Sequence, residues 1–452
     1  MIKSVNPYNQ QEVFSIEELS EKQVKEAIDR ADERFKSWRK TSFAQRKKYM
    51  LAAAEELKNN KQEYAEAMTQ EMGKPIKQAI AEIEKCAWVC EYYAEKAEKH
   101  LSSKAIETDA EKSYVSYEPI GVVLAVMPWN YPYWQVFRFA VPALMAGNVG
   151  LLKHASNVMH CGEKIQQIFE RAGFPKDCFQ HLPLNSSKIE AVIRNRRVKA
   201  VTLTGSKPAG SSVASIAGEE IKKSVLELGG SNALVVFADC NLEETIKTCV
   251  QARFQNTGQS CIAGKRLLVE DSIADAFTEK FVKAVKELKS GDPMDENTFI
   301  GTLAREDLAE DLEKQLKSSV KEGAKILTGG KRDKAYFEPT VVDDVKSDMT
   351  LFKEETFGPV IGITRFKDEE EAVDLVNQSD FGLGVSIFTE DRKKAEQLIP
   401  QFDDGAVFVN DLVKSDPRLP FGGTKISGYG RELSSDGIQE FVNRKTVYFN
   451  AY

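Results

Sequence analysis

One cysteine and one glutamate in this 452-residue sequence stand in settings where each could be reactive. Cys261 lies in the small-residue stretch GQSCIAGKR, just ahead of the apolar run LLV, and Glu227 lies 34 residues earlier in LELGG. A glutamate between leucines is costly to bury without a partner or a purpose. A nucleophilic cysteine usually works with a base. The pair therefore suggests a thiol nucleophile served by a carboxylate.

Other roles for Cys261 are a disulfide, a metal ligand or a packed core thiol. The seven cysteines are odd in number and form no C-x-x-C, so we expect no disulfide framework. Only Cys86 and Cys90 are close together, at the spacing of one helix face, so we expect no metal site. A protease-like cysteine would need a histidine, and none stands in an obvious catalytic loop; the four are His100, His154, His160 and His181.

Composition and charge exclude several classes of protein. The 62 basic and 69 acidic residues give a net charge of −7, and no long basic stripe suggests nucleic acid as a partner. No apolar run approaches the roughly 18 residues of a membrane span. The first residues, MIKSVNPYNQQEVFS, lack the apolar core of a secretory signal. We therefore expect a cytoplasmic protein without a membrane or nucleic-acid partner.

Helices and buried strands alternate along most of the chain. Ser20 to Gln23 has the S-x-x-Q form of a capping box, and apolar residues follow at helical spacing as far as Trp38. More helix follows to about residue 100. Continuous apolar runs then alternate with helical segments; they are IGVVLAVM, NVGLLKH, VKAVTLT, NALVVF, KRLLV, PVIGITRF, GVSIF and AVFVN. This order predicts two α/β lobes, each with a parallel sheet covered on both faces.

Two further segments, SYVSYEP and the C-terminal KTVYFN, alternate like exposed strands. Exposed strands of this kind often pair with another chain. They suggest a surface for self-association.

Four loops that follow predicted strands carry polar or glycine-rich motifs: MPWNYP (127–132), KHAS (153–156), TGSKPAG (204–210) and LELGGSN (226–232). Ligands of doubly wound sheets bind at the carboxyl ends of strands. TGSKPAG is not the G-x-G-x-x-G fingerprint, yet a Gly-Ser turn that opens a helix offers free N–H groups to a phosphate. An ordinary strand–helix turn explains the same motif equally well.

Taken together, the motifs resemble those of the aldehyde dehydrogenase superfamily. LELGGSN and GQSCIAGKR look like its paired signatures, and PWN, the lysine of KHAS, TGSKPAG, EETFGP (354–359) and PFGG (420–423) follow the family order over essentially the whole chain. Within the family, VMPWNYPYWQVFRFAVPALMAGN and VKSDPRLPFGGTKISGYGRE most resemble bacterial succinate-semialdehyde dehydrogenases of about 450 residues.

The resemblance implies a mechanism that agrees with the residue chemistry. Cys261 attacks the aldehyde, and the Asn130 amide and the Cys261 backbone N–H hold the oxyanion. Hydride transfer to the nicotinamide leaves a thioester, and Glu227 activates the water that hydrolyses it. That role requires a carboxyl pKa raised by apolar surroundings.

The resemblance also implies a cofactor site for NADP or NAD. Lys153 is expected at the adenosine ribose, Trp129 and Ser206 near the pyrophosphate, Glu355 at the nicotinamide ribose and Phe357 at the ring, while Gly205 and Gly229 leave room. Three residues after the lysine, many NAD-preferring members have glutamate, and this sequence has Ser156. Serine neither accepts strongly from a 2′-hydroxyl nor repels a 2′-phosphate, so we expect NADP to be favoured.

Arg138 carries the substrate prediction. It stands four residues beyond Trp134, among Phe137, Phe139 and Val141, and a buried guanidinium needs a partner. That partner is either a structural Asp or Glu or the substrate's distal carboxylate, which a planar guanidinium can hold by two bonds. Family resemblance favours the carboxylate of a substrate such as succinic semialdehyde, and it adds four further contacts: Ser260, Ser415, Trp134 and Phe421.

The predicted fold is an aldehyde dehydrogenase-like α/β fold with cofactor and catalytic lobes and a small β oligomerisation element. The predicted division assigns 1–101 and 119–227 to the NAD(P)-binding domain, 228–432 to the catalytic domain, and 102–118 with 433–452 to the element that makes a homodimer or homotetramer. Alternatives are a dehydrogenase for another small or medium aldehyde and a coenzyme A-acylating enzyme, which needs no general base such as Glu227. A non-catalytic binding protein on the same fold would be expected to lack the nucleophile or the Asn130 amide.

Overall fold

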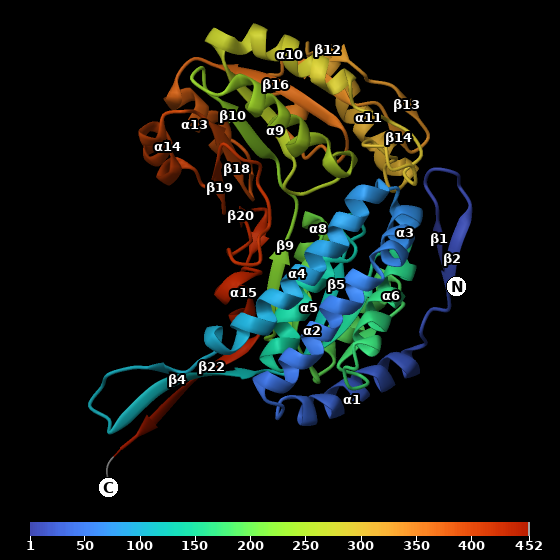
Figure 1. Cartoon of the computed structure of the whole chain (residues 1–452), viewed down its shortest axis with the longest axis vertical. Coiled ribbons are helices and arrows are strands. Elements are labelled where there is room, and N and C mark those ends of the chain that lie inside the picture. The colour runs from blue at the N-terminus through green and yellow to red at the C-terminus, as the bar shows by residue number, and fades with distance from the viewer. Residues whose placement is uncertain (451–452) are drawn as a thin grey trace.

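The computed structural model describes residues 1–450 and has two α/β lobes, one above the other, with a β arm that projects from the lower lobe (Figure 1). The lower lobe contains both the N-terminal helices and the first parallel sheet, and the upper lobe contains the second sheet. The predicted two-lobed α/β class is confirmed.

The first sheet has six strands in the order β21-β9-β8-β5-β6-β7. All neighbours are parallel except β21, which runs antiparallel to β9. The strands are β5 (Val122–Met127), β6 (Val149–His154), β7 (Phe179–His181), β8 (Val198–Thr204), β9 (Lys223–Glu227) and β21 (Gly428–Tyr429). The apolar runs that predicted β5, β6 and β8 are almost wholly buried, as a sheet covered on both faces requires.

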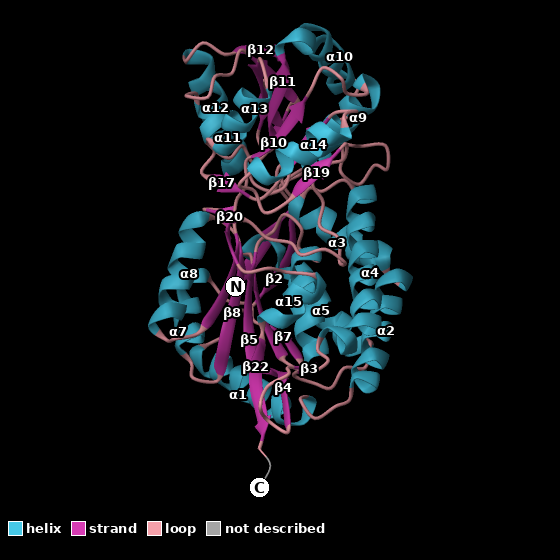
Figure 2. Ribbon diagram, turned by 90° about the vertical axis from the view of Figure 1, so that its left-hand side faces the viewer, coloured by secondary structure: helices cyan, strands magenta, loops and turns pink. Residues whose placement is uncertain are grey.

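Helices cover both faces of this sheet. Figure 2 shows α7 and α8 on one side and α2, α4 and α5 on the other. The helices of this lobe are α1 (Glu21–Trp38), α2 (Phe43–Asn59), α3 (Lys61–Met72), α4 (Ile76–His100), α5 (Trp134–Ala146), α6 (Met159–Arg171), α7 (Ile189–Arg194), α8 (Lys207–Glu219) and α15 (Ser434–Glu440). The predicted capping box is confirmed, because Ser20 and Gln23 exchange their bonds at the start of α1.

The second sheet has seven strands in the order β12-β15-β16-β11-β10-β18-β19, and only β12 is antiparallel to its neighbour. The strands are β10 (Asn232–Val236), β11 (Gly264–Glu270), β12 (Lys325–Thr328), β15 (Thr340–Asp343), β16 (Val360–Phe366), β18 (Val385–Phe388) and β19 (Val407–Val409). Alternate residues enter two separate cores: Ala233 and Val235 pack on one face, Leu234 and Val236 on the other. Period-two burial on both faces explains the continuous apolar runs.

The helices of the second lobe are α9 (Leu242–Phe254), α10 (Ala274–Lys286), α11 (Glu306–Lys321), α12 (Thr350–Lys353), α13 (Glu369–Asn377) and α14 (Arg392–Leu398). Short strands complete the chain: β1 (Ile2–Val5), β2 (Glu12–Ile16), β13 (Arg332–Asp333), β14 (Tyr336–Phe337), β17 (Phe381–Gly382) and β20 (Thr424–Lys425). Single 3₁₀ turns lie at η1 (Ser156–Val158), η2 (Ser186–Lys188), η3 (Gln255–Gly258), η4 (Asp271–Ile273) and η5 (Ile399–Gln401). Sequence patterns did not predict these short elements.

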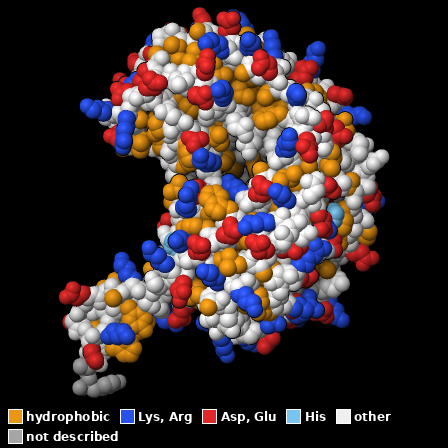
Figure 3. All heavy atoms as spheres, viewed as in Figure 1, with side chains coloured by type: hydrophobic (Ala, Val, Ile, Leu, Met, Phe, Trp, Pro, Cys, Tyr) orange, Lys and Arg blue, Asp and Glu red, His pale blue; other side chains and the backbone are white. Residues whose placement is uncertain are grey.

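The arm is a three-stranded sheet of β3 (Lys104–Ala105), β4 (Lys112–Pro119) and β22 (Val442–Phe449). The two segments predicted as exposed strands pair with each other, antiparallel, from Val442 opposite Pro119 to Phe449 opposite Lys112. Tyr448 and Phe449 are half exposed, and Figure 3 shows hydrophobic side chains gathered on the arm. The last residues of the predicted oligomerisation element, 451–452, lie outside the described residues.

The domain boundary predicted at residue 432 stays a prediction. The chain returns from the upper lobe to the first sheet a few residues before that position. Gly428 of β21 pairs with Glu227 of β9, and Phe421 packs in the core of the lower lobe. Residues 421–432 therefore bring a loop from the upper lobe onto the edge of the lower one. Within residues 1–450, no helix is both long and apolar enough to cross a membrane.

Candidate active site

The first sheet reverses its strand order between β5 and β8. From β5 the chain proceeds outward to β6 and β7, and from β8 it proceeds in the other direction to β9. Ligands of open α/β sheets bind at such a reversal, beyond the carboxyl ends of the strands. The four motif loops predicted from sequence follow β5, β6, β8 and β9, so the structure brings them to one edge of the sheet, facing the upper lobe.

The loop that carries Cys261 has an unusual backbone. Asn256 and Thr257 have φ values of 55° and 54°, and Gly258 has a φ of 74°. Left-handed geometry is costly for residues other than glycine and persists only where the surroundings impose it. Here a Cβ on Gly258 would lie 2.4 Å from the Gly358 carbonyl oxygen. The loop is thus packed directly against the EETFGP segment.

Hydrogen bonds fix the Cys261 loop to both lobes. The Gln259 side chain accepts from the Ala304 N–H at 2.9 Å. The Asn256 amide nitrogen donates to the Asn130 carbonyl at 2.8 Å and to the Gln259 carbonyl at 3.0 Å. These bonds hold Cys261, three residues before β11, in a fixed relation to the loop that follows β5.

Asn130 is buried beside the Cys261 loop. Its Nδ2 donates to the Gln259 carbonyl at 3.1 Å, and its Oδ1 accepts from Gln135 Nε2 at 3.0 Å. An amide nitrogen has two N–H groups, so the bond to Gln259 leaves one available. The bond from Gln135 fixes which end of the amide faces the loop, a geometry suited to an oxyanion donor.

The Cys261 thiol is only partly exposed, and its surroundings disfavour the thiolate. Burial raises the pKa of the Cys261 thiol to about 11, although the positive charges of Arg138 and Lys265 oppose the shift. The free protein therefore holds the thiol in its protonated form at neutral pH. Its activation requires added positive charge or a base.

Glu227 is the last residue of β9, between Thr204 of β8 and Gly428 of β21. It is 2% exposed, and neither carboxyl oxygen has a hydrogen-bond partner. Burial raises the pKa of Glu227 well above its usual range, and the nearby Glu432 adds to the shift. The upward direction of the pKa shift, predicted from the apolar surroundings of Glu227, is confirmed. A Cβ on Gly422 of the PFGG motif would lie 2.8 Å from Glu227 Oε1, so this glycine makes room for the carboxyl.

The predicted adenosine end of the cofactor site carries a buried positive charge. Lys153 is the next-to-last residue of β6 and is 8% exposed, and burial lowers its pKa. Among the described residues it has no hydrogen-bond or ion-pair partner. Ser156 is exposed at the start of η1, and Ser206 precedes α8 without a side-chain capping bond. An unpaired ammonium after one strand and a helix N-terminus after another, both at the carboxyl edge of the same sheet, suit the phosphates of a dinucleotide.

At the predicted nicotinamide end, Glu355 makes an ion pair with the fully buried Lys265 and accepts from the Gly230 N–H at 3.0 Å. Trp129 and Phe357 meet edge to face with ring centroids 5.7 Å apart. A Cβ on Gly229 would lie 2.2 Å from Glu355 Oε2, so Gly229 makes room for this carboxylate.

The predicted cofactor contacts stay predictions. The two glycines predicted to leave room for the cofactor, Gly205 and Gly229, differ in how much space surrounds them. At Gly205 a Cβ would have only an ordinary contact with Leu203, at 3.5 Å. Lys265 was missed by sequence reasoning, although it stands in the GQSCIAGKR motif. It donates to the Cys261 carbonyl at 3.3 Å and so links Glu355 to the Cys261 loop. A buried lysine gives no periodic signal in a sequence.

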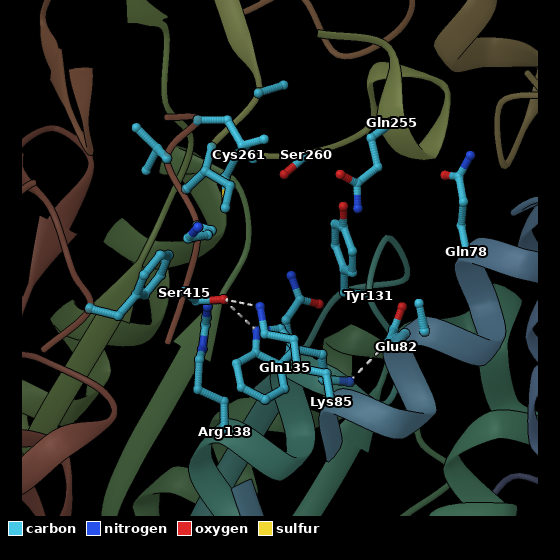
Figure 4. Close-up of a pocket in the computed structure, with 18 of the residues that line it drawn as sticks. Gln78, Glu82, Lys85, Tyr131, Gln135, Arg138, Gln255, Ser260, Cys261 and Ser415 are labelled. Atoms are coloured by element: carbon cyan, nitrogen blue, oxygen red, sulfur yellow. Dashed lines mark hydrogen bonds between the residues drawn. The ribbon is translucent and has the colours of Figure 1, made fainter. Parts of the chain in front are cut away.

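A cavity of about 190 Å³ opens beside Cys261. Cys261 and Ser260 lie at one end, and Lys85, Arg138 and Ser415 lie toward the other (Figure 4). All five predicted substrate residues line it: Trp134, Arg138, Ser260, Ser415 and Phe421. The volume is below the roughly 300 Å³ at which drug-sized sites begin, so the cavity suits a small molecule.

Arg138 has a protein partner. It makes an ion pair with Glu432, both side chains being buried, and its guanidinium lies 4.4 Å from the centroid of the Phe421 ring. Of the two partners considered from sequence, the structural carboxylate is therefore present, supplied by a loop 294 residues farther along the chain. The guanidinium still borders the cavity, so its contact with a substrate stays a prediction.

Sequence reasoning also missed Lys85, which reaches the cavity from α4. Its Nζ donates to Ser415 Oγ at 2.9 Å, and Trp134 Nε1 donates to the same oxygen at 2.9 Å. One lysine among the many of an amphipathic helix looks like a solvated residue, so the sequence offered no signal. Within residues 1–450, no three His, Cys, Asp or Glu side chains gather as metal ligands would.

Comparison with known proteins defines the class. The model of the aldehyde dehydrogenase family matches residues 1–447. The protein belongs to the aldehyde dehydrogenase family, in agreement with the resemblance found in its motifs.

Individual relatives within the family are also similar to the chain over nearly its full length. The chain is 48% identical to a probable NADP(+)-dependent succinate-semialdehyde dehydrogenase of Synechocystis sp., over 99% of each chain. It is 47% identical to succinate-semialdehyde dehydrogenase [NADP(+)] 1 of Mycobacterium tuberculosis, again over 99% of each chain. The crystal structure of succinic semialdehyde dehydrogenase from Streptococcus pyogenes in complex with NADP+ superimposes with a TM-score of 0.97 at 34% identity, and each chain is covered completely.

Proposed function

We propose that the protein oxidises succinic semialdehyde to succinate and uses NADP as the hydride acceptor. The observation that carries the proposal is the cavity itself, which joins a thiol at one end to cationic side chains at the other. A four-carbon substrate with an aldehyde at one end and a carboxylate at the other matches that polarity. The relatives named for this reaction support the same substrate.

The first half of the proposed reaction forms a bond to sulfur. Cys261 loses its thiol proton to a water molecule, and the thiolate attacks the aldehyde carbon. The free N–H of the Asn130 amide and the Cys261 backbone N–H stabilise the oxyanion of the thiohemiacetal. NADP, which Lys153, Ser206 and Glu355 are proposed to hold, would supply the hydride acceptor for that carbon. The carbon is thereby oxidised to a thioester on Cys261.

The second half is hydrolysis. Glu227 takes a proton from a water molecule, the water oxygen bonds to the thioester carbon, and the carbon–sulfur bond breaks to return the Cys261 thiolate and release the acid. A carboxyl without hydrogen-bond donors and with a raised pKa is a stronger base than an ordinary glutamate. Its presence favours release of the free acid over transfer of the acyl group to coenzyme A.

Ser156 supports the preference for NADP. It is exposed, and it places a neutral hydroxyl, not a carboxylate, at the position three residues after Lys153, where the ribose is predicted to bind.

We make two further proposals: self-association through the arm of β4 and β22 into a homodimer or homotetramer, and a cytoplasmic location.

The test is a spectrophotometric assay of reduced cofactor with succinic semialdehyde and butanal, each with NADP and NAD. We expect the highest kcat/KM for succinic semialdehyde with NADP. Equal kcat/KM for the two aldehydes would contradict the substrate, and exclusive use of NAD would contradict the cofactor. Reduction that depends on added coenzyme A would favour the acylating alternative.

A further inference from the structure

Lys85 has an unusual environment for a lysine. It projects from α4 toward the cavity, where its ammonium lies 4.3 Å from the centroid of the Trp134 ring and 2.9 Å from Ser415 Oγ. Most lysines of α4 face solvent, whereas Lys85 is half buried. Among the described residues, no carboxylate lies within ion-pair distance of it.

The other charges around the cavity are paired. Arg138 is paired with Glu432, and Lys414 with Asp411. Glu82 is paired with Lys74. Asp416, next to Ser415, is paired with Arg418. Of the cations that line the cavity in residues 1–450, Lys85 alone is left without a carboxylate.

The electrostatics at this end of the cavity favour an incoming anion. Burial and the nearby Arg138 lower the pKa of Lys85 to about 8. A carboxylate bound beside Lys85 would offset both effects, because an opposite charge favours the protonated ammonium. The same two cations would repel a cationic substrate.

Ser415 completes the arrangement. A hydroxyl has two acceptor positions and one donor proton. Both acceptor positions of Ser415 Oγ are used, by Lys85 Nζ and by Trp134 Nε1 (Figure 4). Its proton is therefore free for an acceptor in the cavity. A carboxylate there would take one bond from the ammonium and one from the hydroxyl.

We propose that Lys85, together with the hydroxyl of Ser415, is the principal ligand of the substrate's distal carboxylate. In this arrangement Arg138, held by Glu432 and stacked on Phe421, shapes the cavity and contributes long-range positive charge. The inference rests on the proposed function, because it needs a substrate that has a carboxylate distal to the aldehyde.

The test compares two aldehydes of equal length in a set of variants. Lys85→Met removes the charge and keeps the bulk of the side chain. We expect kcat/KM for succinic semialdehyde to fall about ten- to a hundredfold, mainly through KM, because one charge-assisted bond is lost. Butanal turnover should stay within about twofold of wild type, which also shows that the variant is folded. Lys85→Arg should restore part of the loss.

Two controls separate Lys85 from its surroundings. Lys77→Met removes an exposed charge from the same helix, and it should leave both aldehydes unaffected. The double variant Arg138→Met with Glu432→Gln removes the neighbouring ion pair without leaving a buried unpaired charge. It should retain most of the wild-type ratio between succinic semialdehyde and butanal, even if both rates fall because Glu432 adjoins Glu227.

The outcomes distinguish the inference from the function on which it rests. A wild-type enzyme with no preference for succinic semialdehyde over butanal would overturn both. A wild-type preference that Lys85→Met retains and that the double variant loses would overturn the inference alone and assign the carboxylate to Arg138. Loss of the preference in Lys85→Met, with butanal unchanged, supports Lys85.

Discussion

Two glutamates near the cavity, Glu82 and Glu227, are buried to a similar extent, at 4% and 2% exposed, and have opposite environments. Glu82 Oε1 accepts from the backbone N–H groups of Tyr133 and Trp134, each at 2.9 Å, and its other oxygen is paired with Lys74. Glu227 has no hydrogen-bond donor. Burial alone therefore does not show what role a carboxyl group has. The number of hydrogen-bond donors around it distinguishes the two glutamates.

The bonds of Glu82 fit a supporting role, whereas the free oxygens of Glu227 fit the role of general base that we propose for it. By accepting the first N–H groups of α5, Glu82 stabilises the start of the helix that carries Trp134 and Arg138 into the cavity. Glu82 accepts three hydrogen bonds, so little of its acceptor capacity is left for a water molecule. Glu227 has that capacity, since both of its oxygens are free.

The largest expected effect is loss of the nucleophile, which removes the partner through which Glu227 acts. Cys261→Ala should reduce NADPH formation to the background rate, because no thioester can form. Cofactor affinity should stay within about twofold of wild type, as measured by calorimetric titration with NADP. Residual turnover would mean that a different group attacks the aldehyde.

Glu227→Gln tests the reactive side of the comparison. Acylation should proceed while hydrolysis stalls, giving at most one equivalent of NADPH per site and a steady rate reduced about 10²- to 10⁴-fold, as for loss of a general base. In the wild type, hydrolysis should weaken as pH falls through the raised pKa of Glu227, because only the deprotonated carboxyl accepts the water proton. Rapid-mixing absorbance measures both phases. Sustained turnover in the variant at neutral pH would exclude Glu227 as the base.

Glu82→Gln is the matched substitution on the supporting side. It leaves Lys74 buried and unpaired, so the free energy of unfolding should fall by about 3–5 kcal/mol. Glu227→Gln breaks no bond and should change that free energy by less than about 1 kcal/mol. Urea unfolding followed by circular dichroism measures both variants. Equal losses of stability would remove the distinction between the two carboxyls.

The cofactor edge should give a smaller effect. Ser156→Glu places a carboxylate near the expected 2′-phosphate, and like charges repel. The ratio of kcat/KM for NADP to that for NAD should fall about ten- to a hundredfold, while Ser156→Ala should leave it nearly unchanged. If the glutamate variant kept the wild-type ratio, the phosphate would bind elsewhere.

The smallest expected effect is the pH dependence of the reactivity of the Cys261 thiol. Since the pKa of Cys261 is about 11 in the free protein, the thiolate fraction should rise about tenfold per pH unit between pH 7 and 9. Iodoacetamide modification at Cys261, followed by mass spectrometry without cofactor, should show that slope, with Cys261→Ser as the control. A plateau below pH 9 would indicate a thiol already activated in the free protein.

The sequence predicted those features that depend on local pattern. Continuous apolar runs gave the strands of both sheets, and the capping box gave the start of α1. Loops at the carboxyl ends of strands, joined to the family motifs, located Cys261, Glu227 and Asn130 near one another. Each of these predictions uses short-range periodicity or a contiguous motif.

What the sequence did not reveal depends on contacts between distant segments. The partner of Arg138 is Glu432, and the contact of Lys85 is Ser415, 330 residues away. Nothing in the spacing of these residues indicates that they meet. Gly229 and Glu355, which also lie close together, are 126 residues apart. Pairing of buried charges is a tertiary property, so it emerges only once the two lobes are placed together.

The arm also has a consequence for synthesis on the ribosome. β4 is complete at Pro119, but its partner β22 begins at Val442. At about 5–20 residues per second, β4 waits roughly 15–65 s for the strand that covers its edge. During that interval the nascent chain presents an unpaired strand edge, the kind of surface that binds other chains. Molecular chaperones that bind extended segments would find their target at residues 112–119 while translation is still under way.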